Sequence, residues 1–239
     1  MNFIKNKRKR AISLKTKVYI VTPVMLNFTI DVFMSQFCSA AIMRGIAEWE
    51  TMPSRAAEDA RNRMMRDVLK NKPQYTHFFF LDADSFPYDA YMIEKLLQHN
   101  KPVIAGPTPT QRCPKNLVGF TNGKLENKRG NIRRLWNVVI EKDGNPVSLR
   151  RDDKNTALDE LPSGLFKAAH VGCTGLLVRR DVIESMTEPY QYTHRNEVGD
   201  VVLSEDYDFC QKIRKAGYDI WIDPTQKSGH RQTIDVGNY

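Results

Sequence analysis

Cysteine is scarce in this sequence and shows no pairing pattern. The 239 residues include only four cysteines, and these are far apart with no Cys-x-x-Cys pair: Cys38, Cys113, Cys173 and Cys210. Such spacing argues against a zinc site and against the disulfide framework of a small secreted protein. We therefore expect reduced cysteines and a cytoplasmic location.

Long apolar runs are also missing. No run approaches the roughly 20 residues needed to span a bilayer, and no apolar signal segment follows the charged N-terminus before Lys15 and Lys17. The sequence thus predicts no transmembrane segment. Because 41% of the residues are hydrophobic, the chain can bury a sizeable core, and we expect one globular domain over residues 18–239.

Acidic residues are absent from residues 1–17, although this segment carries seven basic ones: Lys5, Lys7, Arg8, Lys9, Arg10, Lys15 and Lys17. The formal charge of the whole chain is +8, so 8 − 7 leaves about +1 for the other 222 residues. We expect a basic, flexible N-terminal arm. A solvated terminus is the ordinary interpretation, and contact with nucleic acid or an anionic membrane is the functional alternative.

The most informative stretch present is residues 77–87, in which Phe78-Phe79-Phe80-Leu81 runs directly into Asp82-Ala83-Asp84. A short continuous apolar run is typical of a strand buried on both faces, as in a parallel sheet. Open α/β sheets bind ligands beyond the carboxyl ends of their strands. The Asp-x-Asp pair is therefore predicted to stand at a ligand site.

The first half of the chain reads as a βαβαβ alternation. Strands are expected at 18–23, 77–81 and 103–106, and helices at 29–46, 53–70 and 88–98. Strands separated by helical patterns predict a mostly parallel sheet flanked by helices, an α/β fold.

The second half is less regular. Residues 107–165 break the alternation, with strands expected only at 132–140 and 147–149. Beyond them, strands are expected at 166–171, 175–178 and 219–223, and helices at 180–186 and 204–216. The chain thus divides into a regular half, 18–110, and a less regular half with a smaller β region, 111–239.

Several residues could carry chemistry. Carboxylates at a strand end suit Mg²⁺ or Mn²⁺, which leave coordination positions open for substrate phosphates. In Ser204-Glu205-Asp206, acids at a helix start fit ordinary capping and dipole effects, and they also suit a general base facing a cleft. A lone His230 is more often a packing or surface histidine than a ligand.

In order along the chain, these features resemble the metal-dependent glycosyltransferases with the GT-A fold, particularly the family 2-like branch. The resemblance spans most of residues 17–232 and rests on these pieces: Val21-Thr22-Pro23, Ala60-Arg61-Asn62, Phe80-Leu81-Asp82-Ala83-Asp84, Ile104-Ala105-Gly106, Gly172-Cys173-Thr174-Gly175, Ser204-Glu205-Asp206-Tyr207-Asp208-Phe209, and Gly217-Tyr218 leading to His230.

The resemblance implies a catalytic domain over 18–239 that transfers a sugar from a nucleotide-sugar donor to a glycan or other hydroxyl acceptor, with Mn²⁺ or Mg²⁺ as cofactor. It makes 18–110 the nucleotide-sugar half and 111–239 the acceptor half. It implies Asp206 as base, with Glu205 as second choice, and hence inversion. Implied nucleotide-sugar contacts are Thr22, Pro23, Arg61, Asn62, Asp82, Ala83 and Asp84; implied metal ligands are Asp84, His230 and Asp82; and implied acceptor-side residues are Gly172, Thr174 and Gly175.

Two other functions stay open. A nucleotidyltransferase would also use a carboxylate-held metal, although the sequence has no G-x-x-x-x-G-K-[ST] phosphate loop. A nucleic-acid-binding protein would act through the basic arm. The arm could also serve a glycosyltransferase whose acceptor is a hydroxylated DNA base.

Overall fold

A computed structural model of the chain describes residues 16–25, 30–109, 117–121, 124–127, 138–142, 145–148 and 161–231. All but two residues of the basic arm lie outside this part of the chain, as do Cys113 and most of the strand predicted at 132–140. Within the described part, no helix is long and apolar enough to cross a membrane.

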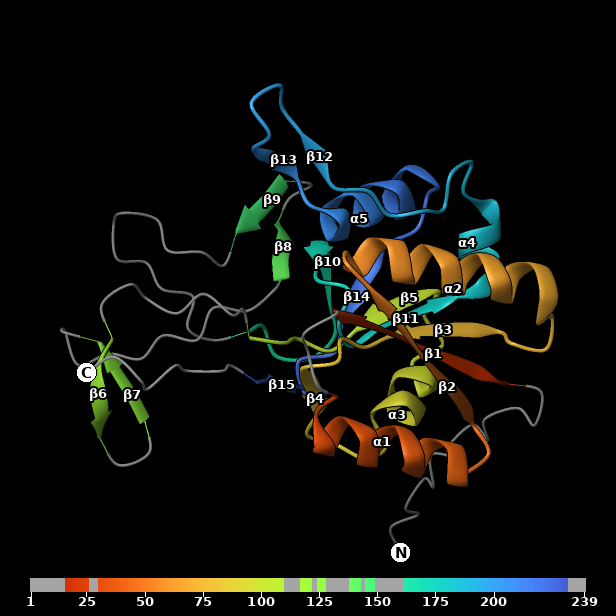
Figure 1. Cartoon of the computed structure of the whole chain (residues 1–239), viewed down its shortest axis with the longest axis horizontal. Coiled ribbons are helices and arrows are strands. Elements are labelled where there is room, and N and C mark those ends of the chain that lie inside the picture. Colours follow the sequence, from red (N-terminus) through yellow and green to blue (C-terminus); the bar gives the residue numbers. More distant parts are fainter. Residues whose placement is uncertain are drawn as a thin grey trace, which may run out of the picture.

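A nine-stranded mixed sheet forms the centre of the molecule (Figure 1). Its order is β2 (Ala47–Ser54), β1 (Val18–Met25), β3 (His77–Phe80), β11 (Leu176–Arg179), β5 (Val103–Ala105), β14 (Ile220–Ile222), β10 (Phe166–Val171), β8 (Val138–Lys142) and β9 (Asn145–Ser148). The pairings make six of these strands run in one direction, with β11, β10 and β9 opposed. The predicted α/β architecture with a mostly parallel sheet is confirmed.

Helices cover both faces of this sheet (Figure 1). On one face lie α1 (Val32–Met43) and α3 (Met92–Gln98), and on the other lie α2 (Ala57–Asn71), α4 (Arg180–Ser185) and α5 (Glu205–Lys215). Three two-stranded sheets stand apart: β4 (Ser85–Pro87) with β15 (Ser228–His230), β12 (His194–Arg195) with β13 (Val201–Leu203), and β6 (Leu117–Thr121) with β7 (Lys124–Asn127).

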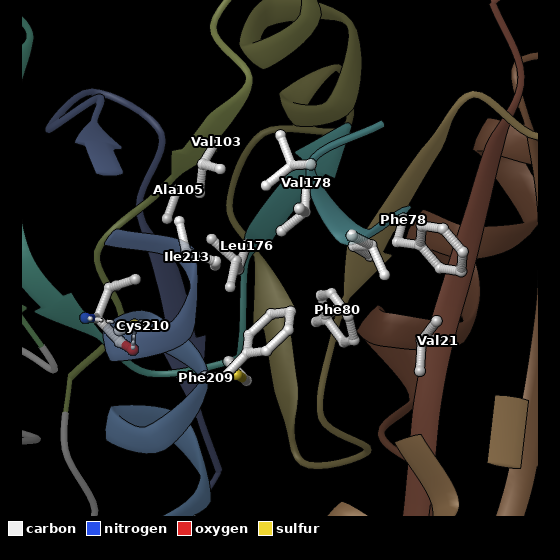
Figure 2. Packing of buried hydrophobic residues seen from close by; sticks show 14 of the residues in the cluster. Val21, Phe78, Phe80, Val103, Ala105, Leu176, Val178, Phe209, Cys210 and Ile213 are labelled. Carbon is white, nitrogen blue, oxygen red and sulfur yellow. Dashed lines mark hydrogen bonds between the residues drawn. The ribbon is translucent and has the colours of Figure 1, made fainter. Parts of the chain in front are cut away.

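The phenylalanine run of β3 explains why both faces are covered. Successive strand residues point to opposite faces, so Phe78 and Phe80 join the core under α2, α4 and α5, while Phe79 and Leu81 join the core under α1 and α3. Figure 2 shows Phe80 facing Phe209 of α5, with ring centroids 5.6 Å apart. A fully apolar strand is therefore required at this position.

One predicted boundary was wrong, and one strand was not predicted. The helix predicted over 53–70 begins at Ala57, and residues 47–54 form β2, an element that the sequence patterns did not indicate. The antiparallel strand β11 lies between β3 and β5, so these two strands are not direct neighbours. One sheet thus interleaves strands from both halves of the chain.

Candidate active site

A pocket of about 270 Å³ opens beyond the carboxyl ends of β1 and β3. Its lining comes from the end of β1, the start of α2, the loop after β3, the first turn of α5 and β15: Pro23, Met25, Ala57, Arg61, Asp82, Ala83, Asp84, Glu205, Asp206 and His230. The location agrees with the rule that open α/β sheets bind ligands at this edge. Five segments from different parts of the sequence therefore converge on one cavity.

Arg61 joins two walls of this pocket. It lies on α2, is only 2% exposed, and its Nη2 donates to Asp82 Oδ1 at 2.6 Å. Its Nη1 lies 3.3 Å from Asp206 Oδ1 and 3.4 Å from Glu205 Oε1. Burial alone would lower the pKa of Arg61, but the surrounding acidic groups outweigh it and hold the pKa well above its usual value. Arg61 is a permanent cation between the acids after β3 and those of α5.

Gln191 supports Arg61 and carries no motif that would have drawn attention to it. Its side-chain oxygen accepts from Arg61 Nη1 at 3.3 Å. Its backbone bonds twice to the Asn62 side chain, with Asn62 Nδ2 donating to the Gln191 carbonyl at 2.8 Å and the Gln191 N–H donating to Asn62 Oδ1 at 2.9 Å. Asn62 is thus a neighbour of Arg61 that anchors a loop, and it does not line the pocket.

His230 meets Asp84 directly. Its Nε2 lies 3.1 Å from Asp84 Oδ1, and its Nδ1 lies 3.1 Å from the Pro109 carbonyl oxygen. Burial alone would lower the pKa of His230, but its bonds to Asp84 and Pro109 raise it above the ordinary value. The pairing of β15 with β4, in register His230 to Ser85, brings this histidine to the pocket.

Asp31 and Arg231 hold the loop that carries Asp84. The Asp31 N–H donates to the Ala83 carbonyl at 2.9 Å, and the Arg231 N–H donates to the Asp84 carbonyl at 2.7 Å. The two side chains form a salt bridge, and the Asp31 carboxylate also caps α1. These residues are 200 positions apart, so no local pattern could have revealed the contact.

The acids of α5 occupy the opposite wall. Ser204 is the N-cap residue, as predicted, although its side chain makes no capping hydrogen bond. Burial raises the pKa of Asp206 to about 6; Arg61 opposes this shift, while the charge of Glu205 adds to it. The buried Cys173 forms a side-chain hydrogen bond with Asp206. The pKa of the Asp206 carboxyl group, about 6, therefore lies much closer to neutral pH than that of an ordinary aspartate.

The remaining predicted residues have varied surroundings. Pro23 and Ala83 line the pocket. Thr22 is buried, with its hydroxyl accepting from Trp49 Nε1 at 3.1 Å, and Thr174 accepts from the Asp82 N–H at 3.2 Å. Neither threonine is among the lining residues, and neither are Gly172 and Gly175. Their predicted roles toward a donor or acceptor stay predictions.

The pocket lining contains side chains of the kinds that can bind Mn²⁺ or Mg²⁺, namely carboxylates and one imidazole. No group of three or more His, Cys, Asp or Glu side chains suited to a metal ion occurs in the described part of the chain. Asp82 turns one oxygen to Arg61, and its role as a third ligand beside Asp84 and His230 stays a prediction. The adjoining Asp84 carboxylate and His230 imidazole are a pair that suits Mn²⁺, with further ligands to come from substrate phosphates and water.

This chain is similar to known proteins in its fold and not in its sequence. No protein-family model matches the chain, and no curated protein matches it in sequence. The crystal structure of A197 from STIV aligns with a TM-score of 0.54 and 15% identity, covering 91% of this chain and 87% of that one. The crystal structure of GalNAc-T7 with UDP, GalNAc and Mn²⁺ aligns with a TM-score of 0.47 and 10% identity, covering 94% of this chain and 45% of that one.

Proposed function

We propose that the protein is a divalent-metal-dependent glycosyltransferase that uses a nucleotide-sugar donor. The observation that carries the proposal is the pocket beyond β1 and β3, in which the Asp82/Asp84 loop and His230 stand on one side and the acids of α5 on the other. Sugar transfer needs this division: one wall holds the diphosphate of the donor, and the other activates the acceptor hydroxyl.

On the donor side, Asp84 and His230 would bind Mn²⁺ or Mg²⁺ together with oxygens of the diphosphate. A divalent cation there would neutralise the charge that develops on the leaving nucleoside diphosphate. Asp82 would accept hydrogen bonds from the ribose through the oxygen that Arg61 does not occupy. The Asp31–Arg231 salt bridge keeps the Asp84 loop in place for this contact.

On the acceptor side, Asp206 would act as the general base. It would take the proton of the acceptor hydroxyl as that oxygen bonds to the anomeric carbon and the bond from this carbon to the diphosphate breaks, which gives inversion. A pKa of about 6 suits the task, because such a base is largely ionised near neutral pH and still a good proton acceptor. Arg61 keeps the carboxylate oriented, and Glu205 is the second candidate for the role.

The test is to incubate the full chain with a panel of nucleotide sugars and Mn²⁺ and to analyse the products. The proposal expects slow release of a nucleoside diphosphate and free sugar from one donor, abolished by a chelator. Release of pyrophosphate from a nucleoside triphosphate would instead identify a nucleotidyltransferase. No turnover and no metal-dependent binding of any nucleotide sugar would refute the proposal.

A further inference from the structure

The segment of residues 190–194, which follows α4 and leads into β12, links α2 to α5. On the α5 side, Lys212 Nζ donates to the Tyr190 carbonyl at 2.7 Å. On the α2 side, the Asn62 side chain holds the backbone of Gln191 through two hydrogen bonds. The segment is thus fixed to both of the helices that contribute charged side chains to the pocket.

The side chain of Gln191 takes no part in this anchoring and contacts Arg61 instead. Gln191 is fully buried, and its side-chain oxygen accepts from Arg61 Nη1 at 3.3 Å. The same nitrogen lies 3.3 Å from Asp206 Oδ1 and 3.4 Å from Glu205 Oε1. One nitrogen of the guanidinium therefore faces two carboxylates and one amide oxygen.

The segment also holds Glu205 from its other side. Thr193, two residues after Gln191, donates through its hydroxyl to Glu205 Oε2 at 3.4 Å, while Glu205 Oε1 faces Arg61. Both oxygens of this carboxylate thus have partners within the protein. The orientations of Arg61 and of Glu205 therefore both depend on this one segment.

An amide suits the place beside Arg61 better than a carboxylate would. Hydrogen bonds between a guanidinium and a carboxylate are roughly twice as strong as those between neutral groups, so a buried acid at position 191 would compete with Asp206 for Arg61. The amide oxygen of Gln191 accepts a hydrogen bond and adds no charge. Arg61 is therefore oriented while its positive charge stays with the acids that line the pocket.

We propose that Gln191 is a positioning residue for the reaction: as a neutral acceptor, it aims the Arg61 guanidinium at Asp206 and so fixes that carboxylate for proton transfer. Gln191 is not among the lining residues, so it acts through Arg61. Proton transfer to a general base requires a hydrogen bond of correct geometry, and small displacements of a reacting group lower the rate strongly. The inference rests on the proposed function, in which Asp206 is the base.

The first variant is Gln191→Ala, assayed by release of nucleoside diphosphate from the nucleotide sugar that the wild type hydrolyses with Mn²⁺. Because the bonds to Asn62 use only the backbone of residue 191, this variant keeps the anchor of the segment and loses the contact with Arg61. We expect kcat to fall about tenfold or more. The Kd of the nucleoside diphosphate with Mn²⁺, measured by isothermal titration, should change by less than about threefold.

The second variant, Gln191→Glu, separates positioning from packing because it keeps the size of the side chain and adds a charge. A residue that merely fills space would tolerate this change. We expect instead that the new carboxylate draws Arg61 away from Asp206 and adds to the negative charges of Glu205 and Asp82, which already act on that group. Both effects raise the pKa of Asp206, so the pH at which kcat/KM falls should move upward by at least about half a unit.

Gln226→Ala is the matched control. Gln226 is also buried, but its amide nitrogen donates to Thr225 Oγ1 at 3.0 Å, and it is not among the lining residues. This variant should keep the kcat and the pH profile of the wild type, and melting temperatures check that all three variants are folded.

Two results would overturn this inference and leave the proposed function standing. One is a kcat of Gln191→Ala that equals that of the wild type or falls only in step with nucleotide affinity. The other is an unshifted pH profile of Gln191→Glu. Absence of turnover in the wild type would overturn the proposed function, and this inference with it.

Discussion

Arg61 is the residue on which the candidate site depends most. A guanidinium can bond in several directions at once from one plane, and Arg61 uses this to contact Asp82, Glu205 and Asp206. Without it, three carboxylates would face one pocket with no countercharge from this position. The sequence suggested Arg61 as a nucleotide contact, but the structure gives it bonds within the protein.

Replacing Arg61 should therefore affect stability as well as activity. We expect Arg61→Ala to lower the free energy of unfolding by about 3–5 kcal/mol, because it leaves partly buried acids without their partner. Chemical denaturation of the purified variant measures this. The control is Arg179→Ala, which removes a more exposed pair with Asp181 and should cost at most about 1 kcal/mol. Equal losses in the two variants would contradict the central role of Arg61.

Asp206 should control the pH dependence of the reaction. Because its pKa lies at about 6, the base is protonated below this pH, and kcat/KM should fall as the pH drops through 6. Asp206→Asn should lower kcat by roughly 100-fold to 10,000-fold while leaving the affinity for the donor nucleotide nearly unchanged. If instead Glu205→Gln abolishes turnover and Asp206→Asn does not, Glu205 is the base.

The elements that sequence patterns predicted well are those with strong local chemistry. The apolar run of β3 and the helical spacing of α5 were both recognised, because burial on two faces and a 3.6-residue period leave clear patterns. Strand β2 was missed because Glu48, Glu50 and Pro53 interrupt it. As the edge strand of its sheet it is mostly half-buried, so it needs no continuous apolar pattern.

Strand β3 also supports a prediction about folding. Its first residue, His77, has a pKa lowered to about 4, by burial first and by the charge of Arg179 second. Because the folded-state pKa lies below the usual 6.5, His77 contributes stability that is fully present above about pH 6.5. This stability is lost as the pH falls through 4, by on the order of 2 kcal/mol.

The measurement is urea unfolding of wild type and His77→Gln at several pH values from 7 to 4. Asp206 acts in the opposite sense, because its raised pKa gives stability that is present below its ordinary pKa and is lost as the pH rises through about 6. The difference between wild type and variant isolates His77, since Asp206 is common to both. That difference should shrink as the pH falls. A constant difference would show that His77 titrates alike in both states.

At the scale of the whole molecule, the sequence predicted an α/β fold and the acids beyond the third strand, but not how the two halves interleave. The direction of β11 and its place between β3 and β5 depend on tertiary pairing that no local pattern encodes. The same holds for Gln191, Asp31 and Arg231, which act through contacts far along the chain. His230 was placed by resemblance, and the structure brings it to Asp84.

The central claim concerns the whole pocket: that Asp84 and His230 bind a divalent cation together with a nucleoside diphosphate. Isothermal titration of the full chain with each common nucleoside diphosphate, with and without Mn²⁺, tests it most directly. Asp84→Asn is the test variant, and Asp219→Asn is the control, because Asp219 forms an exposed pair with Lys167 away from the pocket lining. The account predicts Mn²⁺-dependent binding of one nucleotide that Asp84→Asn weakens at least about tenfold and Asp219→Asn leaves intact. Binding that is indifferent to Mn²⁺ and to Asp84→Asn, or no binding at all, would contradict it.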